Sequence, residues 1–442
     1  MNKGEPATTV GIPTETEVGS VFVSNYPPYS FWSDEAVPAV QLALDSPPVP
    51  GATLGLYVHI PFCRKRCKFC YFRVYTDKNA RDIETYLDAV VNEARLVAGR
   101  PAIVGRPLKF VYFGGGTPSY ISSKHLRSLV RRLRDTLEWD AAEEVTFECE
   151  PGTLTRPRTE AVREVGVTRL SLGIENFNDD ILRENGRAHV SKEIAKVLPW
   201  IAELDFDQLN VDLIAGMVGE TWETWKETVQ KTVETGADSV TVYQMELPYN
   251  TVYSRELISG EGPPVADWQL KREWHAYAFE QLEAAGYEIS SAYTVVKRDK
   301  AARFVYRDSV WQGTDMIGAG VSSFSHVSGV HFQNVSSWGG YLARLQSDQL
   351  PVERAFAISE RERLTRETIL QLKLGRIGSE YFQKKFGVEI LDEFRSAFGA
   401  LEAEKMLEIH GNEVRLTREG LLRVDQLLPV FYAPEYRNAR YT

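Results

Sequence analysis

Three of the four cysteines in this 442-residue chain lie in one short stretch, CRKRCKFC. Cys63, Cys67 and Cys70 are separated by three and then by two residues. Thiolates are ligands that both zinc and iron–sulfur clusters take from proteins. Most of the intervening residues are cations: Arg64, Lys65, Arg66 and Lys68. Because cations favour the thiolate form and offset the charge of a thiolate-ligated centre, the stretch predicts a metal centre.

The residues alone leave three interpretations of this stretch open. The thiols could be idle and buried. They could belong to a structural zinc site, which normally has four ligands, with Cys149 or His59 as the fourth. They could hold a [4Fe–4S] cluster through three thiolates, which leaves one iron open to bind and activate a small molecule. The three-then-two spacing is unusual for zinc, and it favours the cluster.

The sequence around these cysteines, YVHIPFCRKRCKFC, resembles the radical S-adenosylmethionine (SAM) signature C-x3-C-x2-C. More narrowly, HIPFC with CKFC is similar to the oxygen-independent coproporphyrinogen III oxidase group. That group also contains haem chaperones, haem-degrading enzymes, and class C radical SAM methyltransferases and cyclopropanases. The resemblance runs from near residue 54 to the C-terminus. It implies that Cys63, Cys67 and Cys70 hold a [4Fe–4S] cluster, and that SAM is cleaved to methionine and a 5′-deoxyadenosyl radical that abstracts hydrogen.

Two further motifs are candidates for binding the first SAM. FGGGTP contains Gly115, Gly116 and Thr117, and glycines let the backbone approach a ligand closely. A simple tight turn is the alternative. The resemblance assigns this segment to the amino end of SAM. Glu148 ends the third expected strand, where a carboxylate could bind the SAM ammonium or ribose, or else form a strand-end salt bridge.

The resemblance also implies a second SAM, bound by Glu175, Arg187 and Asp212. Arg187 suits a carboxylate by bidentate pairing. Glu175 departs from the family, which commonly has Gln at that position. Tyr57 and Phe69 match positions that contact adenosine, where an aromatic surface can stack or pack; each could otherwise belong to the core.

Apolar segments alternate with helix-like periodic segments, which predicts parallel βαβ units. The expected strands cover residues 55–60, 108–113, 144–149, 168–173, 208–214 and 238–244, and the expected helices include 82–98 and 124–137. Six units match the partial (β/α)6 barrel, an α/β fold, that the resemblance implies. Chemistry in such barrels lies at the C-terminal ends of the strands, and the cysteines follow the first strand. Strand alternation places Cys149 opposite to Glu148, as a packed thiol.

Four regions are expected along the chain. They are an N-terminal extension (1–50), the partial barrel (51–285), a barrel-associated α/β extension (286–359) and a C-terminal α+β, winged-helix-like cap (360–442). Within them, YEISSAYTVV predicts one strand, TDMIGAGVSSFS predicts a Gly-rich turn between apolar pieces, and ALEAEKMLEI predicts an amphipathic helix.

Composition limits the setting and the partners. The net charge of -10 argues against a nucleic-acid partner. The N-terminus shows no secretory signal and no apolar run is long enough to span a bilayer, so no membrane partner is expected. Few cysteines fit a reducing cytoplasm. The cations beside the cysteines could form a docking site for an acidic electron donor such as flavodoxin or ferredoxin.

The substrate prediction depends on what is missing. The chain has CKFCYFRVY where a coproporphyrinogen oxidase typically reads CYFCGC, and YRDSVWQG where a haem chaperone has HNxxYW. Aromatic residues follow the cysteines instead (Tyr71, Phe72 and Tyr75), and they suit an unsaturated or aromatic small molecule. We therefore expect transfer of a one-carbon unit from a second SAM to an sp2 carbon, by methylation or cyclopropanation. The alternatives are oxidative decarboxylation of a tetrapyrrole, and a non-enzymatic haem chaperone.

No catalytic acid or base can be assigned from the sequence. Glu246, Tyr243 and Glu175 lie near expected strand ends, where a base could act, but each could equally be structural.

Overall fold

Six parallel strands form the centre of the molecule in the computed structural model, which describes residues 16–300, 302–437 and 439. They pair in chain order: β1 (Leu54–Ile60), β2 (Leu108–Gly115), β3 (Glu144–Cys149), β4 (Arg169–Glu175), β5 (Gln208–Ala215) and β6 (Ser239–Gln244). All five pairings are parallel. The predicted partial barrel is confirmed, with every expected strand within two residues of its observed bounds.

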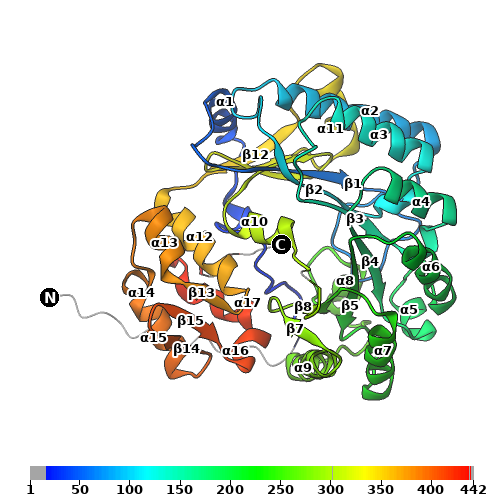
Figure 1. The fold of residues 1–442 in the computed structure, drawn as a ribbon, viewed down its shortest axis with the longest axis vertical. Helices are drawn as coiled ribbons and strands as arrows, with labels where there is room; N and C mark the ends of the chain where they lie inside the picture. Colours follow the sequence, from blue (N-terminus) through cyan, green and yellow to red (C-terminus); the bar gives the residue numbers. More distant parts are fainter. Residues whose placement is uncertain (1–15, 301, 438, 440–442) are drawn as a thin grey trace.

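Helices between the strands cover the outside of the barrel (Figure 1). They are α2 (Ala80–Ala98), α3 (Ser123–Arg134), α4 (Arg156–Glu164), α5 (Asp179–Glu184), α6 (Ser191–Glu203) and α7 (Trp222–Thr235). The sequence of α2 explains its start: the Asn79 side chain accepts hydrogen bonds from the Arg81 and Asp82 backbone, and Asp82 accepts one in return. Because apolar residues face the helices, the polar residues of the strands are left on the inner side of the barrel.

Further strands extend both edges of this sheet, which has 12 strands in the order β12-β11-β10-β9-β1-β2-β3-β4-β5-β6-β8-β7. The elements after the barrel are α8 (Val252–Ile258), α9 (Trp268–Ala284), β7 (Tyr287–Ile289), β8 (Thr294–Lys297), α10 (Val305–Trp311), β9 (Asp315–Ala319), β10 (Phe324–Val327), β11 (Val330–Asn334), α11 (Trp338–Gln346) and β12 (Val352–Ala357). The turn in TDMIGAGVSSFS is as expected. YEISSAYTVV is not one strand but a hairpin, because Ser290 and Ser291 turn the chain and donate their N–H groups to the Thr294 carbonyl.

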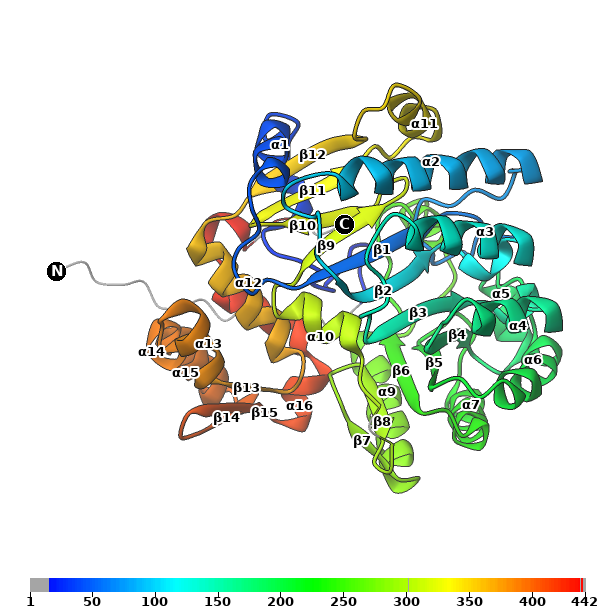
Figure 2. The same ribbon diagram turned by 45° about the horizontal axis from the view of Figure 1, so that its top comes forward.

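The C-terminal region forms a lobe beside the barrel, orange to red in Figures 1 and 2. Its elements are α12 (Glu360–Leu372), β13 (Arg376–Gly378), α13 (Ser379–Phe386), α14 (Ile390–Glu393), α15 (Arg395–Ala403), β14 (Leu407–His410), β15 (Glu413–Leu416), α16 (Arg418–Leu422) and α17 (Val424–Leu427). The sheet order is β13-β15-β14. The helix predicted for ALEAEKMLEI is wrong in its second half. Lys405 has a positive φ of 60°, which ends the helix, and Ile409 then pairs with Val414 in a strand.

The described part of the N-terminal extension crosses from one edge of the barrel to the other. Gly19 forms a bridge with Leu247 after β6, and Ser33 forms one with Ala355 in β12. This segment leads into α1 (Val37–Asp45). Short 3-10 helices lie at Tyr29–Phe31, Pro118–Tyr120, Pro151–Thr153, Leu428–Phe431 and Pro434–Tyr436. None of the helices in the described ranges has the length and apolar composition that crossing a bilayer requires.

Candidate functional site

The three clustered cysteines lie on a loop that leaves the C-terminal end of β1 and is closed at its base. Tyr75 donates its backbone N–H to Pro61, and Cys63 donates its own to Tyr75, at 2.8 and 3.1 Å. The middle of the loop is tied down as well, because the Lys68 N–H bonds to the Asn185 carbonyl at 3.1 Å. The cysteines are therefore held by backbone contacts that do not depend on their own side chains.

Each thiol of this loop is free and faces one large cavity. The Cys63 sulfur lies 3.3 Å from the Thr117 hydroxyl, and Arg187 donates from Nη1 to the Cys67 sulfur at 3.5 Å. Burial raises the pKa of Cys63 to about 11 and that of Cys70 to about 12, and the charge of Cys67 adds to both. Thiols that are desolvated beside one another suit a cationic centre that deprotonates them on binding. The three residues therefore fit a [4Fe–4S] cluster.

The structure gives less support to a zinc site, because it provides no fourth ligand beside the three cysteines among the described residues. Cys149 is packed in the hydrophobic core with 4% of its surface exposed, as strand alternation predicted. Among the described residues, no three His, Cys, Asp or Glu side chains are grouped to hold a metal ion. The thiolates of a cluster bind different iron atoms, so they need not converge on one point.

The glycine segment after β2 packs directly against the start of the cysteine loop. Gly116 donates its N–H to Ile60, and Thr117 donates to Phe62, both at 2.8 Å. A Cβ on Gly116 would lie 2.9 Å from the Pro61 backbone, so no larger residue fits. Gly115 has a φ of 114°, which glycine adopts readily. These glycines place Thr117 against Cys63 and leave the segment beside the cavity, where the first SAM was expected.

Arg187 and Glu175 lie together beside the cysteines. Arg187 is in the loop after α5, and its Nη2 donates to the Gly173 carbonyl at 2.7 Å and lies 3.5 Å from Glu175 Oε1. Its Nε is buried without a hydrogen-bond partner. Two of the residues expected at a second SAM are thus brought together, and Arg187 contacts a cysteine of the loop.

We expect Glu175→Gln to stabilise the cluster-free protein at pH 8 but not at pH 4.5. Burial raises the pKa of the Glu175 carboxyl from 4.5 to about 7, although Arg187 opposes the shift. The folded state therefore holds this proton over a pH range in which the unfolded state has lost it, and stability falls as the pH rises from 4.5 to 7. Glutamine does not titrate, so the variant should gain about 1–3 kcal/mol at pH 8.

Urea unfolding at the two pH values measures this difference. The exposed carboxylate Glu227 in α7 provides a control, and Glu227→Gln should be neutral at both. A Glu175→Gln protein less stable than wild type at pH 8 would show that the pairing with Arg187 outweighs the burial.

Glu148 and Asp212 lie deeper in the barrel. Glu148 accepts hydrogen bonds from the Tyr112 hydroxyl at 2.7 Å and from the Gly115 backbone at 3.1 Å. Burial raises the pKa of Glu148 to about 7 and also raises that of Asp212. Asp212 accepts from Ser171 at 2.7 Å and from Asn210 at 2.9 Å. Both carboxyls face the cavity and neither has an ion-pair partner among the described residues.

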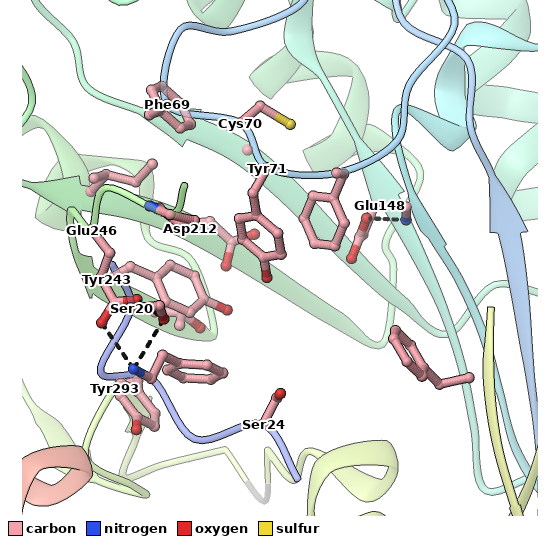
Figure 3. A pocket seen from close by; sticks show the side chains of 18 of the residues that line it. Ser20, Ser24, Phe69, Cys70, Tyr71, Glu148, Asp212, Tyr243, Glu246 and Tyr293 are labelled. Atoms are coloured by element: carbon pink, nitrogen blue, oxygen red, sulfur yellow. Dashed lines mark hydrogen bonds between the residues drawn. The ribbon is translucent and has the colours of Figure 1, made fainter. Parts of the chain in front are cut away.

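The cavity has a volume of about 1200 Å³ and reaches from the cysteines to the C-terminal lobe. Figure 3 shows Tyr71 projecting into it between Cys70 and Tyr243. Tyr71 stacks on Phe72 with ring centres 4.4 Å apart. The predicted aromatic wall is thus present at these two residues but not at Tyr75. Because the backbone of Tyr75 pairs with the loop base, its ring points away and packs on Trp338 at 5.1 Å.

Tyr57 and Phe69, the residues expected to contact adenosine, both line the cavity. The Tyr57 hydroxyl lies 3.2 Å from His59 Nδ1, and its ring stacks on Tyr112 with centres 5.8 Å apart. Phe69 also packs against a small apolar cluster that includes Met245.

The N-terminal extension is hydrogen-bonded to the carboxylate of Glu246, one of the residues considered as a base. Glu246 accepts hydrogen bonds from the backbone of Val21 at 3.1 Å and of Phe22 at 3.0 Å, and from the Ser20 hydroxyl. Residues 20–22 of the extension are called the strap below, and Figure 3 shows Ser20 of this strap beside Tyr243 and Tyr293. Glu246 therefore holds residues 20–22 across the cavity in this structure, and its carboxylate is engaged by them.

Several cavity residues were missed by the sequence reasoning. They are Tyr112, Arg169, Tyr293, Phe304 and Tyr306. Only Arg169 could have been predicted from a local pattern. The alternation in TRLSLG places Arg169, Ser171 and Gly173 on one side of β4. The others come from segments whose apolar character does not distinguish the cavity from the core.

Comparisons with known proteins agree with the fold and with the cysteine loop. Residues 57–232 match the radical SAM superfamily. The chain is 26% identical to an oxygen-independent coproporphyrinogen III oxidase of Synechocystis over 92% of this chain and 91% of the relative. It is 27% identical to the heme chaperone HemW of Bacillus subtilis over 85% and 98%. The structure of coproporphyrinogen III oxidase (HemN) from Escherichia coli superimposes with a TM-score of 0.79, at 23% identity, over 93% and 96%.

Proposed function

Since the chain carries a radical SAM domain, we propose that this enzyme oxidatively decarboxylates a carboxylate side chain of a tetrapyrrole. The observation that carries the proposal is the cavity. Its volume of about 1200 Å³ exceeds the roughly 300–1000 Å³ of ordinary small-molecule sites, which leaves room for a large substrate beside SAM. Aromatic rings line it, and so do guanidinium groups from distant parts of the chain: Arg169, Arg272, Arg354, Arg366 and Arg423. The names of the coproporphyrinogen III oxidase relatives support the same substrate class.

The residues of the site have distinct parts in this proposal. Cys63, Cys67 and Cys70 would hold the [4Fe–4S] cluster, and the segment with Thr117 would lie along the methionine end of SAM. When bound, a reduced cluster and SAM supply a carbon radical that removes a hydrogen atom from the substrate. Arg187 would stabilise the Cys67 thiolate, and the buried walls would keep water away from the radical.

The substrate chemistry balances as an oxidation. One hydrogen atom leaves a propionate side chain from the carbon β to its carboxylate. The carboxylate then leaves as CO2, one electron passes to an external one-electron acceptor, and the two remaining carbons form a vinyl group.

A second candidate is one-carbon transfer from a second SAM to an sp2 carbon, giving methylation or cyclopropanation. It is favoured by Tyr71, which fills part of the cavity beside Cys70 where coproporphyrinogen oxidases typically have a smaller Gly-Cys pair. It is also favoured by the group formed by Arg187 and Glu175, which is separate from the Glu148 group and could take a second cofactor. A non-enzymatic haem chaperone is disfavoured because YRDSVWQG, in α10, has no histidine.

An isotope experiment separates the two reactions. We expect deuterium from a propionate-labelled coproporphyrinogen III to appear in 5′-deoxyadenosine, and none to arrive from SAM labelled in its methyl group. Mass spectrometry of 5′-deoxyadenosine and of the porphyrin product measures both. Deuterium arriving from the SAM methyl group would contradict the oxidation and establish the one-carbon transfer.

The proposal includes an acidic electron donor of the flavodoxin or ferredoxin type. The cysteine loop presents exposed cations, Arg64, Lys65 and Arg66, and the same loop lines the cavity. Complementary charge would steer such a donor to within reach of the cysteines. This chemistry needs reduced thiols, which supports a cytoplasmic location.

A further inference from the structure

Arg169 is an arginine at the floor of the cavity whose guanidinium forms no ion pair with any residue that the structure describes. It is the first residue of β4, it lines the cavity, and only 2% of its surface is exposed. Its Nε and Nη1 are buried without a hydrogen-bond partner. The guanidinium has no hydrogen bond or ion pair with any residue in the described ranges.

Other arginines with little exposed side chain make at least one ion pair or side-chain hydrogen bond within the described ranges. Arg307 forms an ion pair with Asp308 at 2.7 Å and also donates to Ser290. Arg106 pairs with Asp315 at 3.0 Å. An unpaired buried charge is costly because it has lost its hydration without gaining a partner. The exception at Arg169 therefore points to a partner that comes from outside the chain.

The surroundings of Arg169 leave its edges available for such a partner. Its guanidinium lies over the Phe304 ring, 3.9 Å from the centroid, which covers one face. The rings of Tyr112 and Tyr306, 4.3 Å apart, complete an aromatic floor beside Phe304. Glu148 and Asp212 line the same cavity, and the charge of Arg169 lowers the pKa of each, but neither carboxyl is within ion-pairing distance of the guanidinium. A planar fork of N–H donors in an aromatic setting suits a carboxylate.

We infer that Arg169 binds a carboxylate of the substrate at the floor of the barrel. This inference rests on the proposed function, since a tetrapyrrole with propionate side chains supplies such a group. Arg169 precedes Glu175 by six residues of the same strand, which places its backbone roughly 20 Å from the end of β4 nearest the cysteines. One propionate would thus be held at the floor while another part of the substrate lies near the cysteine loop.

The test compares two probes with the same macrocycle, coproporphyrin III and its tetramethyl ester, on the anaerobically reconstituted enzyme. Porphyrin absorption and fluorescence measure binding. Wild type should bind the free acid at least tenfold more tightly than the ester. Arg169→Met should lower affinity for the acid at least tenfold and leave that for the ester unchanged, with Arg169→Lys in between. Arg303→Met, an exposed neighbour with the same charge change, should behave like wild type.

A stability measurement separates a binding role from a structural one. Because the Arg169 guanidinium makes no hydrogen bond or ion pair with the described residues, Arg169→Met, which keeps an apolar side chain against Phe304, should melt at or above the wild-type temperature in the absence of ligand. A lower melting temperature would show that Arg169 holds the fold, and would overturn the inference. Acid binding by Arg169→Met within twofold of wild type would also overturn it.

Failure of the proposed function has a different outcome. An enzyme that binds the acid through Arg169 but forms no 5′-deoxyadenosine with dithionite would refute the radical chemistry and leave the carboxylate site standing. An enzyme that cleaves SAM but shows no preference for the acid would refute the carboxylate site alone.

Discussion

Replacing Cys67 by alanine is expected to abolish both metal binding and SAM cleavage. Reconstituted wild-type protein should contain about four iron atoms per chain, and the variant should contain almost none. Cys67 lies between the other two ligands on a loop that the backbone already holds, and its sulfur is the one that Arg187 contacts. With only two thiolates left, the site should no longer hold a cluster. Iron and sulfide analysis, with 5′-deoxyadenosine formation under dithionite, measures the result.

Cys149→Ala is the matched control for this experiment. The same side chain is removed, but from the core, where Cys149 is buried in β3. This variant should keep its iron and its cleavage activity. Loss of iron from Cys149→Ala would revive a site with four cysteines, and cleavage retained by Cys67→Ala would refute the radical SAM assignment of this loop.

Arg187→Met is expected to lower SAM cleavage by about 10–150-fold while the protein still folds. The structure gives Arg187 contacts with the Cys67 sulfur, the Gly173 carbonyl and the Glu175 carboxylate, and its side chain is 11% exposed. A hydrogen bond to a charged group contributes about 1.5–3 kcal/mol, which corresponds to that range. The variant also leaves Glu175 without its cation. Because Arg187 lowers the pKa of Glu175, that pKa should rise further above 7 in the variant.

The control and the readouts separate cluster binding from cofactor binding. Arg183→Met removes an arginine from neighbouring α5 that is 59% exposed and, among the described residues, pairs with Asp179 and Asp180 at the surface, so it should be neutral. If Arg187→Met keeps its iron but loses SAM affinity, Arg187 binds the cofactor; if iron is lost, it supports the thiolates. Cleavage within twofold of wild type, with iron unchanged, would contradict both roles.

The elements of the barrel were predictable because their determinants are local. The strands are rich in apolar residues, which are continuous in FVYF of β2 and alternate with polar ones in EVTFEC of β3, and α2 is started by Asn79 and Asp82 at its own N-terminus. Two secondary-structure predictions were wrong, because contacts with distant residues outweighed the local sequence preference. In YEISSAYTVV, β-forming residues continue through a turn that is fixed by Ser290 and Ser291 and by a contact between Ala292 and Lys373. In ALEAEKMLEI, pairing with β15 draws the last residues into a strand.

The amino-acid sequence by itself predicted the cysteine centre, since three cysteines at a fixed spacing on one loop form a unit whatever surrounds them. It also determined the barrel that carries the loop. Only the tertiary structure decided the shape and charge of the cavity. The strap meets Glu246 across 225 residues of chain, and Val23 meets Asp425 across 402. Arg169 likewise is unpaired only because no described carboxylate comes within reach of it after folding. Such contacts depend on which distant segments pack together, and no local pattern encodes them.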